Sequence, residues 1–174
     1  MKIRKVTPDI HPKVSALLRQ AFPDSTNEAL IVDSLHNHNK IIYEWICIHI
    51  NMVIAHIAFS KAYKGTDVCG LHLGTLAVKP EFQNRGIGSE LLRFSLRQEP
   101  IKDSTIFVFG PPAFYNKFGF EPCSIPTCTR NKKGCSFLSM RNNESVPFTV
   151  GYEQEFIFAA PKINTVSPSN RRRR

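Results

Sequence analysis

The chain has 174 residues, of which 42% are hydrophobic and 21% are charged, the balance of a soluble globular protein whose single core needs no disulfide or metal staple. Arg171 to Arg174 carry four of the nine net positive charges, so the body is only moderately basic, which suits an anionic ligand as well as nucleic acid. The most apolar stretch, 45–59, is interrupted by polar residues and is too short to cross a bilayer, so we expect no membrane-spanning segment. We also expect no secretory signal, because the first residues are charged and polar.

In the first half of the chain, the pattern predicts a strand, two helices and a hairpin. Apolar residues at 14, 17, 18 and 21 form one stripe on a helix that begins at His11. Ser25 and Glu28 match a capping box before a second helix. Segments rich in β-branched and aromatic residues flank Asn51 and predict an antiparallel hairpin. The expected elements are a strand over 3–6, a helix from 11, a helix over 27–36, and strands over 43–50 and 52–60.

The second half alternates strands and helices around glycine and proline breaks. A strand should stop before Pro80, which cannot donate to a β-ladder, and Gly119 should be a left-handed cap after a short helix. The expected elements are strands over 71–78 and 105–109, helices over 86–98 and 113–117, and late strands over 136–140 and 154–158. The segment from 160 to 174 has nothing to bury, so we expect a disordered basic tail.

The five cysteines are an odd number that cannot all pair. Reduced thiols in a cytoplasmic protein are the simplest interpretation. Three of them, Cys123, Cys128 and Cys135, could be imagined as zinc ligands, but their spacing lacks the tight pair typical of zinc sites. We therefore predict no metal.

The most informative feature is a glycine-rich turn that leads from a strand into a helix. It reads Gln83-Asn84-Arg85-Gly86-Ile87-Gly88, and Ser89 follows. Amides at a helix start have no partner within the helix and can bind an anion, and glycines let a phosphate approach the backbone closely. No P-loop string exists, and a dinucleotide fingerprint would need glycine where Leu91 stands. The pattern that fits is Q/R-x-x-G-x-G/A after a strand.

The segment from Leu76 to Leu92 resembles the central motif of the GCN5-related N-acetyltransferases (GNAT family). A second segment, Ala113 to Phe120, resembles the later signature F-Y-x-x-x-G-F of that family, and G-P-P-A-F-Y-N-K-F-G-F-E-P resembles its small bacterial YhbS-like branch. The resemblance implies a single α/β (α+β) domain over 1–159, with a mixed, mostly antiparallel sheet flanked by helices and a splayed central strand pair.

The resemblance also implies acetyl-coenzyme A as co-substrate. Its diphosphate would meet the amides of Asn84 to Ser89, including Gly86, Ile87 and Gly88, with Gln83 and Arg85 as side-chain helpers. Its pantetheine arm would pair with a strand edge, as an added strand does. By position, that edge belongs to Leu76, Ala77 and Val78.

By motif position, Tyr115 is the expected catalytic acid. A phenol with a pKa near 10 can protonate the thiolate that leaves when an amine attacks the thioester. The alternative is an aromatic core residue beside three phenylalanines. The family often carries an asparagine before this helix, where Phe109-Gly110-Pro111 stands here, so pantetheine contacts in that region stay open.

The general base stays open among His72, Glu28, Asp33, Asp67 and a water chain. The acceptor is an amine on a small molecule or a peptide, and neither its identity, the preferred acyl chain nor a homodimer can be deduced from the residues. The rival hypothesis from another functional class is a basic nucleic-acid-binding module. The sequence contains no recognisable nucleic-acid-binding motif that would support it. A third hypothesis keeps the fold as a non-catalytic acyl-coenzyme A sensor.

Overall fold

A single eight-stranded sheet organises the chain. The computed structural model describes residues 1–25, 27–130 and 132–158; the predicted tail over 160–174 and the predicted domain end at 159 lie outside them. The strand order is β1-β2-β3-β4-β5-β7-β6, and β8 pairs with the far end of β3. All these pairs are antiparallel except β4 with β5, which confirms the predicted mixed, mostly antiparallel sheet. The strands are β1 (Lys2–Lys5), β2 (Tyr43–His49), β3 (Met52–Lys64), β4 (Asp67–Val78), β5 (Ile106–Gly110), β6 (Glu121–Pro122), β7 (Ser136–Met140) and β8 (Gly151–Tyr152).

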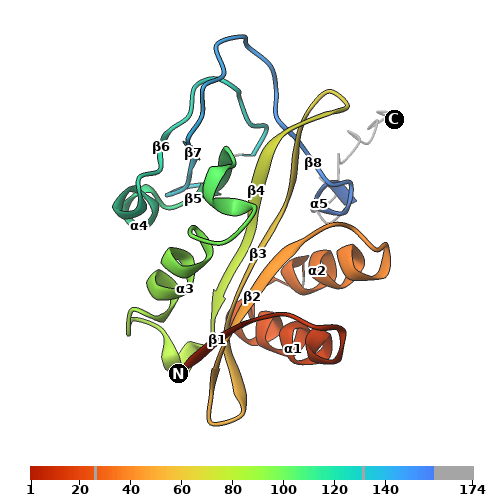
Figure 1. Ribbon diagram of the computed structural model, residues 1–174, viewed down its shortest axis with the longest axis vertical. Helices are drawn as coiled ribbons and strands as arrows, with labels where there is room; N and C mark the ends of the chain where they lie inside the picture. Colours follow the sequence, from red (N-terminus) through yellow and green to blue (C-terminus); the bar gives the residue numbers. More distant parts are fainter. Residues whose placement is uncertain (26, 131, 159–174) are drawn as a thin grey trace, which may run out of the picture.

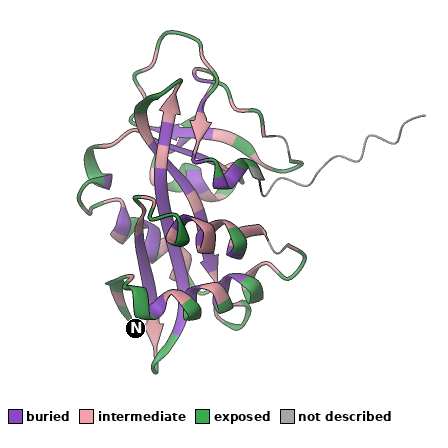
Figure 2. Cartoon of the chain, turned by 90° about the vertical axis from the view of Figure 1, so that its right-hand side faces the viewer, coloured by how far each residue is buried: buried purple, intermediate pink, exposed green. Residues whose placement is uncertain are grey.

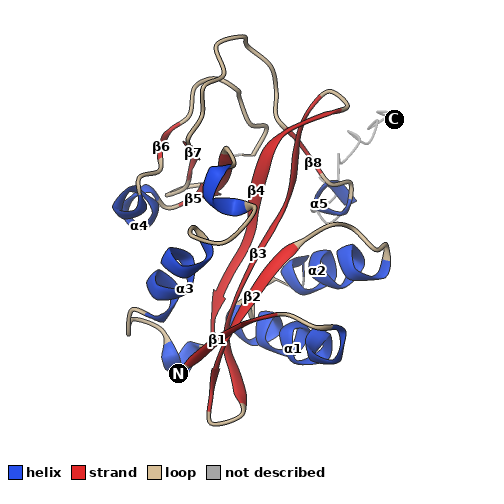
Figure 3. Ribbon diagram, in the orientation of Figure 1, coloured by secondary structure: helices blue, strands red, loops and turns tan. Residues whose placement is uncertain are grey.

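Helices cover both faces of the sheet (Figures 1 and 3). One face is covered by α1 and α2, whose apolar residues pack with Ile46, Val53 and Ala77. The other face is covered by α3, whose Leu91 and Leu92 pack with Phe59 and other buried sheet residues. Figure 2 shows the buried residues following the central strands between these layers. The helices are α1 (His11–Ala21), α2 (Asn27–Asn37), α3 (Ile87–Ser95), α4 (Pro112–Tyr115) and α5 (Glu155–Phe158).

Local signals in the sequence set several of these boundaries. The Ser25 hydroxyl donates to the Glu28 carboxylate at 2.6 Å and accepts the amide of Asn27 at 3.2 Å, so this serine caps α2 as predicted. Between β2 and β3, Ile50 and Asn51 have φ of 45° and 60°, and two left-handed residues are the hairpin turn that matches strand twist. Gly119 has φ of 90° after α4 and its 3₁₀ extension, Asn116–Phe118, which confirms the predicted left-handed cap.

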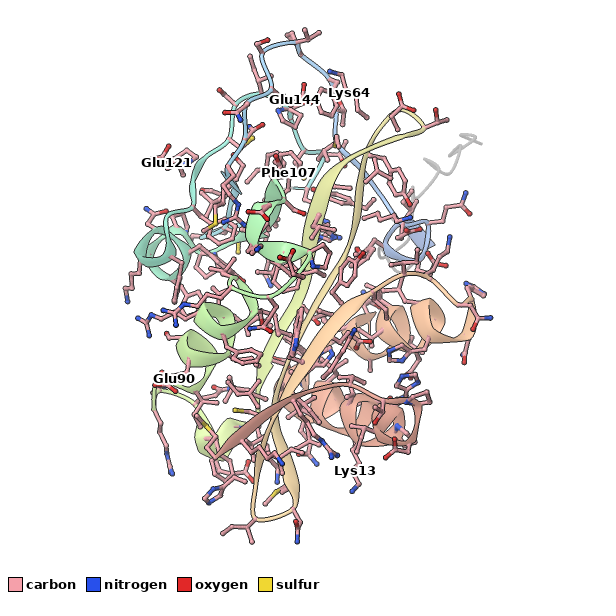
Figure 4. All side chains as sticks on the ribbon, viewed as in Figure 1. Lys13, Lys64, Glu90, Phe107, Glu121 and Glu144 are labelled. Atoms are coloured by element: carbon pink, nitrogen blue, oxygen red, sulfur yellow. The ribbon has the colours of Figure 1, made fainter. Side chains whose placement is uncertain are left out.

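The parallel pair at the centre of the sheet separates after two residues. β4 and β5 are paired only at Leu71–Ile106 and His72–Phe107, although β4 runs on to Val78. The cause is visible in the pairing of β4 with β3, where Gly74 is an extra residue between the pairs of Leu73 and Thr75. Such a bulge bends its strand and increases the local twist. The strand pair is therefore splayed, as the family resemblance implied, and Phe107 lies fully buried at the point of separation (Figure 4).

The predicted late strand over 154–158 is wrong. The amides of Phe156 and Ile157 donate to carbonyls three residues earlier, which makes α5 a single helical turn. This turn is held by contacts from distant segments, because Glu155 meets His38 at 2.8 Å and Glu153 meets Lys40 at 3.1 Å. The run Phe156-Ile157-Phe158 has a high strand preference, and tertiary contacts overrode that local preference.

A third long-range ion pair links the chain between β7 and β8 to the sheet. Lys64, the last residue of β3, meets Glu144 at 2.9 Å, and Figure 4 shows both side chains together at one end of the molecule. In the described part of the chain, no helix combines the length and apolarity needed to cross a bilayer.

Candidate active site

An open groove of about 580 Å³ lies where β4 and β5 separate. Its walls come from the end of β4, the turn before α3, the first turn of α3, and α4. Eight of the ten residues predicted to bind the co-substrate line this groove, together with the predicted acid Tyr115. These are Leu76, Val78, Gln83, Asn84, Gly86, Ile87, Gly88 and Ser89.

The turn into α3 presents a row of amides without acceptors. Asn84 has φ of 58° and Gly86 has φ of 79°, so two left-handed residues curl the backbone just before the helix. The first helical hydrogen bond runs from Glu90 N–H to Gly86 C=O at 3.0 Å. Within 27–130, the amides of residues 84–89 donate to no oxygen. Successive unpaired N–H groups of this kind form a concave anion site.

Gln83 has a different contact from the one expected. Its side-chain amide donates to the carbonyl of Val78 at 3.0 Å, which fastens the turn to the end of β4. Gly88 supports the same junction, because a Cβ there would lie 3.3 Å from a methyl group of Val78. The turn with its free amides is thus held at a defined position relative to the open strand edge.

The pairing of β4 with β3 decides which backbone groups face the groove. Lys79 N–H donates to Ile54 C=O at 2.8 Å, and backbone groups of an antiparallel strand alternate between its two edges. Ala77, two residues before Lys79, therefore bonds toward β3, where it is paired with His56. Leu76 and Val78 direct their backbone groups to the opposite, open edge. Ala77 is accordingly absent from the groove lining, and its side chain packs among α1 and α2.

Tyr115 is buried, and its hydroxyl has no hydrogen-bond partner among the described residues. The side chain is only 7% exposed. Burial, with a smaller effect from Cys135, raises the pKa of the phenol well above its ordinary value. The group is therefore protonated at neutral pH and lines the groove, although burial makes it a weaker acid than a solvent-exposed phenol.

Four residues that the sequence analysis did not assign to the site also line the groove: Phe82, Pro111, Phe114 and Lys117. Lys117 could have been found from the sequence, because it lies two residues after Tyr115 in the same motif, and a positive side chain is expected near a bound anion. Arg85, in contrast, is not in the lining, and its guanidinium lies over the ring of Phe82 at 5.5 Å.

The candidate bases lie outside the groove lining. His72 is fully buried between Tyr152 and Phe156, with ring centroids 4.1 and 4.6 Å away, and neither ring nitrogen has a partner in the described residues. Burial, then the nearby charge of Arg130, lowers the pKa of His72 well below its ordinary value. Of the acidic candidates, Asp33 accepts from Ser15 at 2.9 Å and Glu28 accepts from Ser25 at 2.6 Å.

A buried polar network lies on the face covered by α1 and α2. Glu44 contacts His36 at 2.7 Å and His56 at 2.8 Å. Burial alone would raise the pKa of Glu44, but these hydrogen bonds outweigh it and lower the pKa to about 2. His11 and His36 stack at 3.5 Å with planes 4° apart. One ligand atom from each of His11, His36 and Glu44 lies within 4.8 Å of the other two. The lone pairs of the two stacked rings lie in parallel planes and therefore do not converge on one point.

Among the described residues, Cys123, Cys128 and Cys135 do not form a metal-ligand group. All five cysteines are free thiols.

Comparisons with known proteins agree with this geometry. Residues 41–122 match the family described as acetyltransferase (GNAT) domain. YjhQ, an uncharacterized N-acetyltransferase of Escherichia coli strain K12, is 39% identical over 75 residues, and the match spans 41% of each chain. The aligned region is thus well under half the length of that relative.

Two solved structures share the fold across most of the chain. YhbS, a GNAT family N-acetyltransferase from Escherichia coli in complex with coenzyme A, has a TM-score of 0.79 at 24% identity, covering 90% of this chain and 91% of its own. A GNAT family acetyltransferase from Brucella melitensis in complex with acetyl-coenzyme A has a TM-score of 0.75 at 25% identity, covering 89% and 97%.

Proposed function

We propose that this chain, whose residues 41–122 match the acetyltransferase (GNAT) domain family, transfers an acetyl group from acetyl-coenzyme A to a primary amine by direct attack. The observation that carries the proposal is the groove in which an unpaired strand edge, a row of free amides and Tyr115 meet. The likeness to structures solved with coenzyme A and acetyl-coenzyme A supports the same co-substrate.

The turn before α3 is proposed to bind the diphosphate. Amides from Asn84 to Ser89 have no competing acceptor in the described chain, and each helix-end interaction with an anion contributes about 0.3–1 kcal/mol when exposed. A Cβ at Gly86 would meet nothing within 4 Å, so this side of the turn is open for the phosphates. Lys117 adds a positive charge to the same groove.

The open edge of β4 is proposed to bind the pantetheine arm. Leu76 and Val78 point backbone groups away from β3, and no strand within residues 1–25, 27–130 and 132–158 is paired with them there. An extended amide-containing ligand can add to such an edge as an extra strand. The proposal keeps Leu76 and Val78 as backbone partners, and Ala77 takes part only by packing.

Tyr115 is proposed to be the catalytic acid. When the amine nitrogen bonds to the thioester carbonyl carbon, the nitrogen loses a proton to solvent water, the carbon–sulfur bond breaks and the thiolate leaves with the electron pair. The phenol donates its proton to that sulfur and is reprotonated from solvent. Positioned proton donation is worth about 10²–10⁴-fold. The amine must attack as the free base, which at pH 7 costs about 4.6 kcal/mol for a lysine-type amine and about 1 kcal/mol for an α-amino group.

Two measurements test the proposal. Calorimetric titration with acetyl-coenzyme A should show binding, and a thiol-release assay across metabolite, antibiotic and peptide amines should identify the acceptor. A flat titration would refute the enzyme assignment. Binding without thiol release for any amine would favour the acyl-coenzyme A sensor, and steeply salt-dependent nucleic-acid binding that ignores the co-substrate would favour the rival module.

The five free thiols support action in a reducing compartment such as the cytoplasm.

A further inference from the structure

The last residue of β5, Gly110, lies directly against the ring of Tyr115. A Cβ built on Gly110 would stand 2.5 Å from Cε2 of the ring, 3.2 Å from Cδ2 and 3.5 Å from Cζ. Atoms of real side chains do not approach to 2.5 Å, so the ring occupies the space that any side chain at Gly110 would need. The closest atoms belong to the ring edge that leads to the hydroxyl.

The chain path explains why the ring returns to this point. Gly110 is the last β5 residue paired with β7, opposite Ser136. Pro111 then turns the chain with φ of −69° and ψ of 120°, and α4 begins at the next residue. The amide of Tyr115 donates to the carbonyl of Pro111 at 3.3 Å. One helical turn therefore carries Tyr115 back over the end of the strand that it has just left.

Aromatic neighbours hold the ring from other sides. Phe114 meets it edge to face at 5.0 Å between centroids, and Phe120 meets it in a similar way at 5.5 Å. Close-packed interiors leave little room for a ring to relax. Displacement by a new methyl group at Gly110 would therefore move the ring toward the open groove.

We infer that Gly110 is a positioning residue for Tyr115, because only a residue without a side chain lets the phenol lie where its hydroxyl can protonate a leaving thiolate. The inference rests on the proposed function for its catalytic consequence, but the placement itself can be measured without any activity. It also gives a physical reason for Gly110-Pro111-Pro112 at a place where the resembled family often carries an asparagine.

The size of the effect follows from the distances. Restoring an ordinary contact of at least 3.4 Å from 2.5 Å requires the ring to retreat by about 0.9 Å. A misplacement of about 1 Å at a reacting group can reduce the rate about 10²-fold. Gly110 is not among the residues with positive φ, so alanine can adopt its backbone conformation, and the contact with Tyr115 is the main perturbation.

The experiment compares Gly110→Ala, Tyr115→Phe, their combination, and Gly151→Ala as the matched control. Gly151 also lies in a strand, and a Cβ there would make an ordinary contact at 3.5 Å. The chain has four tyrosines, so a ¹³C-tyrosine-labelled sample gives few ring signals, and the signal lost in Tyr115→Phe identifies Tyr115. That signal should shift in Gly110→Ala and stay in place in Gly151→Ala.

The kinetic expectation is a drop in kcat of about 10- to 100-fold for Gly110→Ala, with a much smaller change in KM for acetyl-coenzyme A. In the Tyr115→Phe background the same substitution should change kcat less than about twofold, since no proton donor is left to misplace. An unmoved Tyr115 signal, or kcat losses that multiply fully in the double variant, would overturn the inference.

Two further outcomes keep this inference separate from the proposed function. A shifted Tyr115 signal in a protein that releases no thiol with any amine would support the placement and remove the enzyme assignment. Should Gly110→Ala fail to fold, Tyr115→Leu in the same chain removes the ring and is expected to restore folding. A double variant that stays unfolded would contradict the ring contact as the cause.

Discussion

Replacing Gly86 with alanine should weaken co-substrate binding through the backbone alone. Gly86 has φ of 79°, and a Cβ there would touch nothing within 4 Å, so the penalty is conformational and not steric. Left-handed backbone costs a residue with a Cβ about 1–2 kcal/mol. For a chain of this size, that corresponds to a fall in Tm of about 2–8 °C.

The same backbone strain should change the orientation of the free N–H groups of residues 84–89, and so weaken their hydrogen bonds to a bound anion. Losing about 1–2 kcal/mol of anion binding would raise KM for acetyl-coenzyme A about 5- to 30-fold. The proposed catalytic acid, Tyr115, lies on α4 and not on this turn, so kcat should change little. Steady-state kinetics with the co-substrate varied, and calorimetry for its Kd, measure both effects.

A matched control separates strain from function. Gly65, in the turn between β3 and β4, has φ of 62° and also meets nothing within 4 Å. Gly65→Ala should therefore lower Tm by a similar amount and leave KM unchanged. Gly86→Asn extends the comparison, because asparagine tolerates left-handed backbone but places a side chain in the space proposed for the phosphates. Equal KM for Gly86→Ala, Gly65→Ala and the parent chain would refute the proposed anion site.

Tyr115→Phe should lower kcat about 10²- to 10⁴-fold while leaving the free energy of unfolding almost unchanged, because the hydroxyl has no partner among the described residues; a kcat within twofold of the parent would remove its role. Gln83→Ala should raise KM for acetyl-coenzyme A about fivefold by removing about 1 kcal/mol of hydrogen bonding to Val78. Gln98→Ala loses a similar amide–carbonyl bond of 3.2 Å away from the groove, and an equal KM change there would contradict the assignment. Glu44 has a pKa of about 2 in the folded chain, below its ordinary value. Its contribution to stability is therefore present above about pH 4.5 and lost as pH falls toward 2, about 3 kcal/mol in total; acid unfolding that is equally steep in Glu44→Gln would argue against it.

The sequence alone predicted the elements whose causes are local. A serine two residues before α2, a proline after β4 and a glycine after α4 each act on the backbone within a few residues. The turn from Gln83 to Ser89 is local in the same sense, because its φ angles and free amides follow from glycine and the start of a helix. For that reason most of the predicted groove-lining residues are found together in the structure.

Contacts between distant segments had no such local signal. Ala77 and Leu76 are neighbours in the chain, yet only the pairing with β3 decides that Leu76 faces the open edge. The segment 154–158 was predicted as a strand, but ion pairs to the chain after α2 hold a helical turn there.

The amino-acid order therefore determined where the unpaired amides of the proposed anion site lie, since such amides need only a glycine turn and a helix start. The tertiary structure decided how those amides are positioned relative to the open edge of β4 and to Tyr115. The bulge at Gly74 separates β4 from β5 and leaves the edge of β4 unpaired. The Gln83 side chain holds the turn against the end of β4 by its hydrogen bond to Val78. The absence of a side chain at Gly110 leaves room for the Tyr115 ring. The physical reason is that each of these depends on atoms from separate segments meeting at van der Waals or hydrogen-bond distance, which only the folded chain brings about.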